Sequence, residues 1–520
     1  MNLLYPTQLE DNSFRKDHTA LVSVKALGLP RLLAMEELDI LRLLTADPDV
    51  LAYRQEIFRD LKENPALYDI LKKLRDYLAD LRDLSQKRAV MGSSTEDVLY
   101  SFGELKVFID MILEITGSVG HFRPQLTSRA LIGLLDTMDR IRGDASFPEV
   151  KGYVDKILST LRFPRSVTLG VNLNARFEPY EVGVVSINSE YYIGGGLFST
   201  MFGKTAADGG LRCNTPLVTG EAAASFSNAI YSVINADIAR SLKKARSMML
   251  SYIQNTVSEL AVVYDDLNFI LRGAEYVRDL ENRKVHTVLP EYGQSLRFHR
   301  LINPALLRKL SAGQIISNDV SFPEDSCILL ITGPNSGGKS VYVKAVGIAV
   351  LTAQLGLPVA AVSGEMPVFA SVYCHFPAED SADDSRLVEE CKAMREILDG
   401  TDEHSLILMD ESFSGTGSAE GTVIAEEVLK TIRHRRASAI YSTHLHELAA
   451  RVPVLNEKSP KIVTLSAEYV SGRRTYRVIP TKPGGRSYAY EIARQYGLEF
   501  DETILRIIHS FYHPLTDFCS

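Results

Sequence analysis

The segment CILLITGPNSGGKS, residues 327–340, joins an apolar run to a glycine-rich turn. An apolar run bounded by such a turn is typical of a buried strand. Gly333, Gly338, Lys339 and Ser340 fit the pattern G-x-x-x-x-G-K-[ST]. The glycines let backbone N–H groups face a phosphate, and the helix that follows adds the positive end of its dipole. The segment therefore predicts a phosphate-binding loop between a strand and a helix.

Two further apolar runs downstream end in polar side chains. SLILMDE, residues 405–411, ends in Asp410 and Glu411, and SAIYS, residues 438–442, is followed by His444. A strand-end aspartate is placed to hold Mg²⁺ through water, and the adjacent glutamate can polarise an attacking water. His444 either contacts the γ-phosphate or the water, or is merely structural, and its residue type leaves both interpretations open.

Strands and helices alternate in the second half of the chain, whereas the first half is mostly helical. Residues 285–520 predict an α/β domain with a parallel sheet. Apolar residues at helical spacing predict helices over 35–44, 49–62 and 66–84. The predicted fold is therefore mixed: a helical core with long lever helices and a small β-rich insertion, then an α/β domain.

Residues 166–220 differ from both halves. SVTLGVNLNARFE and YEVGVVSINSEYYI have β-like patterns, and a glycine-rich stretch follows from Gly194 to Gly220. The triple glycine at 194–196 lacks the Lys-Ser pair of a phosphate loop, so a loop or hairpin tip is preferred over a ligand site.

Residues 221–272 contain neither glycine nor proline. One unbroken helix of this length would extend about 80 Å, which suggests a lever or coiled-coil arm, with or without a kink. A solvated face is preferred over a phosphate-contacting stripe for its basic residues, Arg240, Lys243, Lys244 and Arg246.

Composition narrows the class of protein. The 520 residues carry a net charge of −8 and are 45% hydrophobic, which excludes a disordered or fibrous chain. The length predicts roughly three domains. The five cysteines are scattered, the start of the sequence does not resemble a leader, and no apolar run is long enough to span a membrane. These features predict a cytoplasmic protein without membrane contact. The negative charge argues weakly against a generally basic nucleic-acid coat but leaves room for a local basic groove.

At this point the residues resemble a known family. TGPNSGGKS, LILMDESFSGTGSAEG and STHLHEL, in this order, resemble the ATPase domain of the DNA mismatch-repair MutS family. SNDVSF (317–322), DSRLVEECKAMREIL (384–398) and GGRSYAYEIARQYGL (484–498) are similar to further segments of that domain. The resemblance is strong over about 300–500 and weaker in the helical first half.

The resemblance implies an ABC-type, Mg²⁺-dependent ATPase that works as a head-to-tail homodimer. Glu411 and His444 would be catalytic, and Ser340 and Asp410 would hold Mg²⁺. Ser385 would contact the partner's nucleotide, in trans. The resemblance further implies two sets of residues: ATP contacts at Gly333, Pro334, Asn335, Ser336, Gly337, Gly338, Lys339, Ser340 and Val341, and a dimer-interface loop at Gly415, Thr416, Gly417 and Ser418.

The sequence also departs from the family pattern. Ser336 stands where the family usually has Met, and the segment from Ser385 reads Ser-Arg-Leu rather than Ser-Thr-Phe. The loop after Glu411 reads SFSGTGS rather than an Arg-Gly-Thr form. The chain begins almost directly with core-like helices, and no Phe-x-Glu occurs in its first hundred residues. We therefore expect a shortened member that lacks the N-terminal mismatch-reading domain.

These observations divide the chain into four expected parts: a helical core and lever domain (1–165), a β-rich segment that is a possible reduced clamp (166–220), long lever helices (221–284) and the ATPase domain (285–520). The leading functional hypothesis is an ATP-switched DNA clamp in DNA repair or recombination, without standard mismatch reading. The alternative is a nucleotide-switched dimeric scaffold for a protein partner, with no DNA contact. An inactive relative is disfavoured because Lys339, Ser340, Asp410 and Glu411 are all present.

Overall fold

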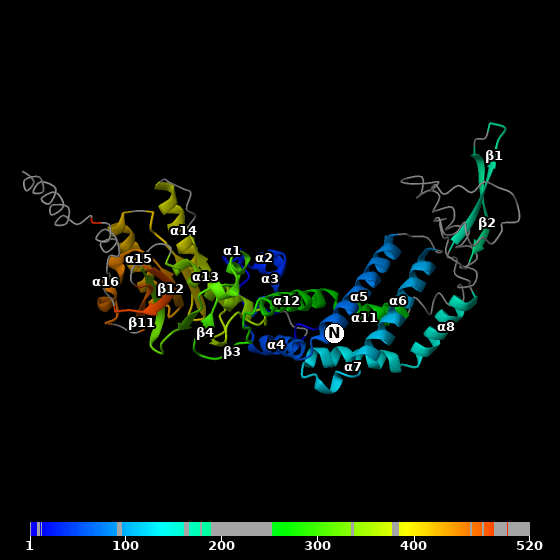
Figure 1. Ribbon diagram of the computed structural model, residues 1–520, viewed down its shortest axis with the longest axis horizontal. Coiled ribbons are helices and arrows are strands. Elements are labelled where there is room, and N and C mark those ends of the chain that lie inside the picture. Colours follow the sequence, from blue (N-terminus) through cyan, green and yellow to red (C-terminus); the bar gives the residue numbers. More distant parts are fainter. Residues whose placement is uncertain are drawn as a thin grey trace, which may run out of the picture. The chain divides into compact units, whose positions relative to one another are not determined.

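The computed structural model describes residues 2–7, 11, 13–90, 96–160, 166–176, 179–188, 252–333, 337–376, 384–415, 417–457, 460–470, 473–482 and 497. The chain divides into two compact units (Figure 1). The helical unit comprises Ala66–Leu126 and Leu131–Asn268, and the sheet unit comprises Asn2–Pro65, Thr127–Ala130 and Phe269–Ser520. The mixed fold class is confirmed. The four-part division made from the sequence stays a prediction.

Long amphipathic helices make up the helical unit. They are α5 (Ala66–Val90), α6 (Glu96–Val119), α7 (Arg129–Gly143) and α8 (Ser146–Thr160), with a short 3₁₀ turn, η1, at Arg123–Gln125. α5 and α6 lie side by side (Figure 1) and bury leucine and phenylalanine side chains such as Leu78 and Phe108. Lys73 and Tyr77 of α5 both donate hydrogen bonds to Glu114 of α6. Burial of the apolar faces, rather than helix propensity, therefore stabilises this unit.

The predicted β-rich segment begins with an antiparallel hairpin of β1 (Ser166–Leu173) and β2 (Pro179–Asn188). Val171 and Leu173 of β1 are exposed. The glycine-rich stretch from Gly194 to Gly220 lies outside the described residues.

Only the end of the expected long helix, from residue 252, is described. Three helical pieces occupy this end: η2 (Ile253–Val257, a π-helix), α11 (Ser258–Ala261) and α12 (Tyr264–Asn282). The helix is thus interrupted between α11 and α12, and α12 continues past Gly273, the first glycine after residues 221–272. A Cβ at Gly273 would meet Leu357 and Phe58 at 2.4 and 2.9 Å, so this glycine permits close packing rather than ending the helix. The four basic residues of the arm lie outside the described residues.

The sheet unit starts with four helices: α1 (His18–Ala26), α2 (Leu29–Leu33), α3 (Glu37–Leu43) and α4 (Pro48–Glu63). Side chains of Asp17 and Asp47 cap α1 and α4, and Pro48 occupies the first position of α4, where its missing N–H costs nothing. The buried Asp60 of α4 accepts hydrogen bonds from the backbone N–H groups of Thr127 and Ser128, at the start of α7.

A six-stranded sheet forms the centre of this unit, in the order β12-β11-β6-β10-β9-β8. Its strands are β6 (Ser326–Thr332), β8 (Ser371–His375), β9 (Ser405–Asp410), β10 (Ser438–Ser442), β11 (Lys461–Val470) and β12 (Arg473–Pro480). All pairs are parallel except β11 with β12. In such a sheet, ligands bind outside the carboxyl ends of the strands.

A smaller four-stranded sheet has the order β3-β7-β4-β5. Its strands are β3 (Glu291–Tyr292), β4 (Arg297–Leu301), β5 (Asn318–Ser321) and β7 (Ser363–Met366). Two short 3₁₀ turns, η3 (Pro304–Arg308) and η4 (Ala312–Gln314), connect β4 to β5.

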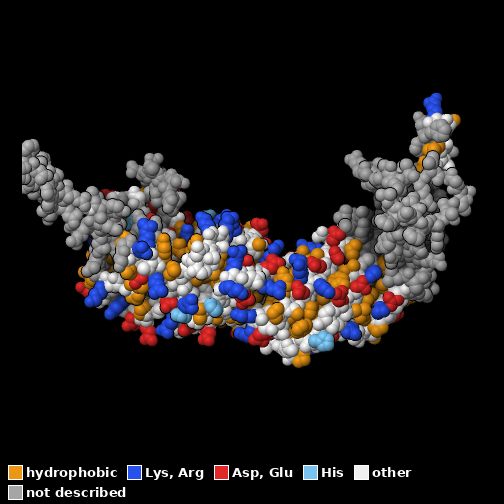
Figure 2. Space-filling view, in the orientation of Figure 1, with side chains coloured by type: hydrophobic (Ala, Val, Ile, Leu, Met, Phe, Trp, Pro, Cys, Tyr) orange, Lys and Arg blue, Asp and Glu red, His pale blue; other side chains and the backbone are white. Residues whose placement is uncertain are grey.

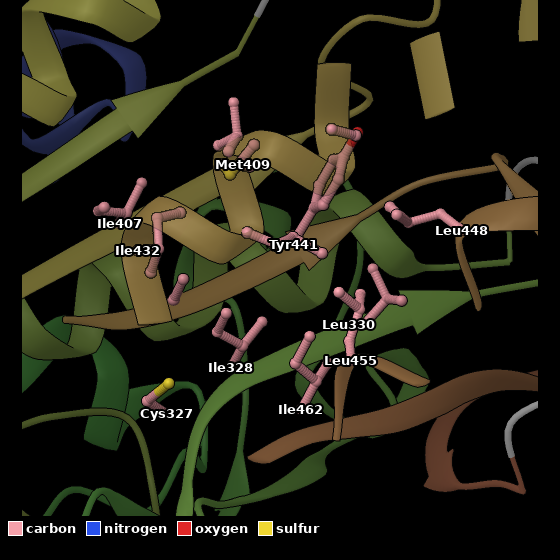
Figure 3. Close-up of a cluster of buried hydrophobic side chains, with 14 of the residues drawn as sticks. Cys327, Ile328, Leu330, Ile407, Met409, Ile432, Tyr441, Leu448, Leu455 and Ile462 are labelled. Atoms are coloured by element: carbon pink, nitrogen blue, oxygen red, sulfur yellow. The ribbon is translucent and has the colours of Figure 1, made fainter. Parts of the chain in front are cut away.

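Helices cover both faces of the large sheet: α13 (Lys339–Ala353), α14 (Asp384–Gly400), α15 (Ser418–His434) and α16 (His446–Leu455). Figure 3 shows the side where Ile328, Ile407 and Tyr441 pack with α15 and α16. On the other side, Gly347 of α13 lies against Leu408. Burial on both faces explains why the strands are continuous apolar runs. No helix among the described residues is long and apolar enough to cross a membrane.

Candidate nucleotide-binding site

The phosphate loop has the predicted strand–loop–helix context. Gly333 follows β6 with φ +126°, and Gly338 caps α13 with φ +96°. Both angles lie in the region that favours glycine, since a Cβ would be strained there. Gly337 is described, and Val341 lies exposed in the first turn of α13. Pro334, Asn335 and Ser336 lie outside the described residues, so their expected contacts stay predictions.

Lys339 is buried at the start of α13. Its ammonium donates a hydrogen bond to the Gly333 carbonyl, 3.0 Å away, across the loop. Burial lowers the pKa of Lys339 from its usual value, and the negative charges of Glu411 and Asp410 oppose this effect. The lysine thus lies within electrostatic reach of both predicted carboxylates.

Ser340 and Asp410 meet at the end of β9. The Ser340 hydroxyl donates to Asp410 Oδ1 over 3.0 Å, and the Ser442 hydroxyl donates to the same oxygen. Hydroxyl and carboxylate oxygens suit a hard cation such as Mg²⁺, so the donor set fits the expected metal. Sequence reasoning missed Ser442, although it ends β10 in register with Asp410 and strand pairing could have found it.

Glu411 and His444 lie side by side beyond the strand ends. Glu411 has φ +55°, and its N–H donates to the Ser442 carbonyl over 2.8 Å. His444 Nδ1 is 3.4 Å from Glu411 Oε1 and makes no hydrogen bond within the described part of the chain. The structure therefore brings together the two residues that were expected to be catalytic. His446, to which the sequence assigned no role, has a pKa lowered by burial and then by His444 and Lys339.

The remaining predicted residues belong to two helix starts. Ser385 is the second residue of α14, and its side chain is outside the described part. Gly415 and Gly417 precede α15, which begins at Ser418, whereas Thr416 is not among the described residues. Their expected dimer contacts stay predictions.

A buried network that sequence reasoning missed fixes the β9 loop (residues 411–415). Phe413 also has a positive φ, +62°, and a non-glycine residue in this conformation costs about 1–2 kcal/mol. Three buried residues outside the loop contact it, and we call them the loop anchor: Glu390 of α14, His375 of β8 and Tyr441 of β10.

Tyr476 of β12 is a further missed residue. It has φ +59°, and its backbone and ring lie about 3.7 Å from a Cβ built on Gly338. Its ring is half exposed beside the start of α13. No motif marks it, because β12 reaches the phosphate loop only through the strand order of the sheet.

Both the N-terminal and the C-terminal part of the chain match models of known protein families. Residues 329–504 match the family model of MutS domain V, and residues 46–193 match that of the MutS2 N-terminal domain. Proteins named Endonuclease MutS2 are 31% identical to this chain in Streptococcus thermophilus (249 residues) and in Staphylococcus aureus (246 residues). Each match covers 46% of this chain and 30% or 32% of the relative.

The chain thus spans about a third of the length of the curated relatives it matches. The domain V match contains the end of β6, the phosphate loop, Asp410, Glu411 and His444. The N-terminal match covers α4 to α8 and the β1–β2 hairpin. The chain is therefore a member of the MutS family, with a MutS2-type N-terminal domain and MutS domain V, an ABC-type P-loop ATPase domain.

Proposed function

We propose that the chain binds and hydrolyses ATP and uses this cycle to switch its grip on DNA. The observation that carries the ATP part is the convergence at three strand ends. Ser340 lies 3.0 Å from Asp410, and Glu411 follows directly, with His444 3.4 Å from its carboxylate. Lys339 completes the set from the start of α13.

Each side chain has a role that its chemistry permits. The Lys339 ammonium contacts the β- and γ-phosphate oxygens as a point charge. Ser340 and Asp410 would hold Mg²⁺, which would neutralise phosphate charge when bound. Glu411 accepts the proton of the attacking water, and His444 orients that water or the γ-phosphate.

Phosphate release from Mg²⁺–ATP tests the proposal, with Glu411→Ala as the key variant. We expect this variant to retain bound ATP and to lose at least 100-fold in kcat. Lys339→Ala should lose nucleotide binding itself. Turnover by Glu411→Ala at the parent rate would contradict its assigned role. Lys430→Ala, which removes an exposed lysine paired with Glu426 and Glu427, is a matched control for Lys339→Ala.

The assembly that we propose is a head-to-tail homodimer. Ser385 contacts the partner's nucleotide, and Gly415, Thr416, Gly417 and Ser418 line the interface. This arrangement follows the family resemblance and places the start of α14 opposite a phosphate loop. Sedimentation of Glu411→Ala with ATP should detect a dimer that Ser385→Ala weakens. An equal dimer with and without nucleotide would contradict the switch.

DNA is the partner that we propose, because the matched relatives carry the name endonuclease, which refers to a nucleic-acid substrate. Binding to duplex, mismatched, branched and single-stranded DNA, at fixed low salt with ATP or ADP, tests this proposal. Phosphate contacts are strongest at low salt, so no binding there would exclude the DNA clamp.

A protein scaffold is the second candidate, and charge favours it. The net charge is −8, and acidic and basic side chains are mixed over the described residues on the face in Figure 2. Partners retained with ATP but not ADP, after nuclease treatment, would support the scaffold over the clamp.

A further inference from the structure

We propose that Glu390 and His375 are positioning residues that hold the β9 loop and thereby aim the Glu411 carboxylate. The proposal rests on the proposed ATP hydrolysis. It adds two residues that neither the motifs nor the family matches assign. His375 and Glu390 contact the loop at Ser412 and Phe413, so we assign their effect on Glu411 to the loop.

Glu390 holds the backbone of the loop. Its Oε2 accepts a hydrogen bond from the Phe413 N–H over 2.6 Å, in a fully buried setting. Phe413 lies two residues after Glu411, and both have positive φ. Such a conformation persists only where the surroundings impose it. The Glu390 carboxylate therefore supplies the hydrogen-bond acceptor for the buried Phe413 N–H.

His375 holds Ser412, the residue between Glu411 and Phe413. Its Nε2 lies 3.1 Å from the Glu390 carbonyl oxygen, and its Nδ1 lies 2.6 Å from the Ser412 hydroxyl. A carbonyl only accepts, so Nε2 carries the proton, and the neutral ring accepts from Ser412 at Nδ1. The ring also stacks on Phe413, with centroids 5.7 Å apart. One imidazole thus links α14 to two consecutive loop residues.

Tyr441 completes the loop anchor from the next strand. Its hydroxyl donates to the Ser412 carbonyl over 2.6 Å. The loop is therefore held at the Phe413 N–H, the Ser412 hydroxyl and the Ser412 carbonyl. These groups directly follow Glu411, the residue that must meet the attacking water. Because Glu390 lies on α14, the position of that helix sets the position of the loop. Small misplacements of a catalytic group lower the rate far more than they lower binding.

A comparison of Glu390→Ala with Glu390→Gln tests the proposal on the full chain. Alanine removes the acceptor, and we expect kcat to fall at least tenfold while the Kd for Mg²⁺–ADP stays within threefold. Glutamine keeps an acceptor oxygen for the Phe413 N–H, so kcat should stay within threefold of the parent. The matched control is Glu389→Ala, an exposed neighbour on α14, which should leave both values unchanged.

The outcomes separate this inference from the proposed function. An unchanged kcat in Glu390→Ala, or an equal loss of kcat and ADP affinity, overturns the positioning role while Glu411→Ala still reports on hydrolysis. No hydrolysis by the parent chain would overturn both. If Glu390→Ala does not fold, Ser412→Ala removes the hydroxyl that meets His375 without a large cavity. It should lower kcat three- to tenfold at unchanged ADP affinity, and a parent-like kcat would overturn the proposal.

Discussion

The Ser442 hydroxyl donates a hydrogen bond to Asp410 Oδ1 across the ends of two neighbouring parallel strands. The same oxygen accepts from Ser340, so two hydroxyls fix one carboxylate oxygen. Both of these hydrogen bonds leave Asp410 Oδ2 uninvolved. The strand end is thus pre-organised by Ser442, the first residue of STHLHEL, to which the sequence assigned no role.

Ser442→Ala should weaken the response to Mg²⁺. Without the second donor the Asp410 carboxylate is less restrained, so we expect the Mg²⁺ concentration for half-maximal ATP hydrolysis to rise three- to tenfold. Ser442→Thr keeps the hydroxyl and is the matched control. A magnesium titration of phosphate release measures the effect, and coincident curves for Ala and Thr would exclude this role.

Gly338→Ala should impair the phosphate loop through its backbone alone. The added Cβ would lie 3.6 Å from the Tyr476 carbonyl oxygen, an ordinary contact, but φ is +96°. The strained backbone costs about 1–2 kcal/mol or moves the loop. We expect a loss of at least tenfold in ADP affinity, measured by calorimetry. Gly313→Ala, with open space and no positive φ, is the control, and equal affinities in both variants would refute the argument.

Gly273→Ala should destabilise the sheet unit. Its Cβ would lie 2.4 Å from Leu357 and 2.9 Å from Phe58, so buried side chains must shift. Overpacking of this kind costs about 1–3 kcal/mol, against a gain of up to about 1 kcal/mol in helix propensity. Urea unfolding measures the net change in the free energy of unfolding. Tyrosine fluorescence can follow the transition, because the chain contains no tryptophan. A variant more stable than the parent would mean that Leu357 and Phe58 accommodate the added Cβ without a loss of folding free energy.

The phosphate loop, Asp410 and Glu411 were predictable because their signals are local. Each follows an apolar strand directly, and parallel strands bring their carboxyl ends to one edge. The loop anchor was not predictable, because Glu390 and His375 reach the loop through the packing of α14 and β8. The role of Gly273 was not predictable for a related reason, because its close approach to Leu357 and Phe58 depends on how α12 packs.

The pH dependence of stability should reveal the buried neutral His375. Burial lowers its pKa below the usual value, whereas in the unfolded chain it titrates near about 6.5. Below that pH the unfolded chain binds a proton that the folded chain refuses, so the free energy of unfolding falls as pH falls. The loss is at most about 1.4 kcal/mol per pH unit for this one group, and it ends at the folded pKa. Above about pH 7 both states are neutral and the group contributes no slope.

His375→Gln removes this titration while keeping an amide near the position of Nε2. Its unfolding free energy, measured by urea titration between pH 7.5 and about pH 5, should fall less steeply than that of the parent. The half-buried His446, whose pKa is also lowered by burial, is present in both proteins, so the difference between the two slopes isolates the His375 imidazole. Parallel slopes would mean that His375 takes up a proton in the folded chain. The ring would then donate from both nitrogens, and Ser412 could no longer donate to Nδ1.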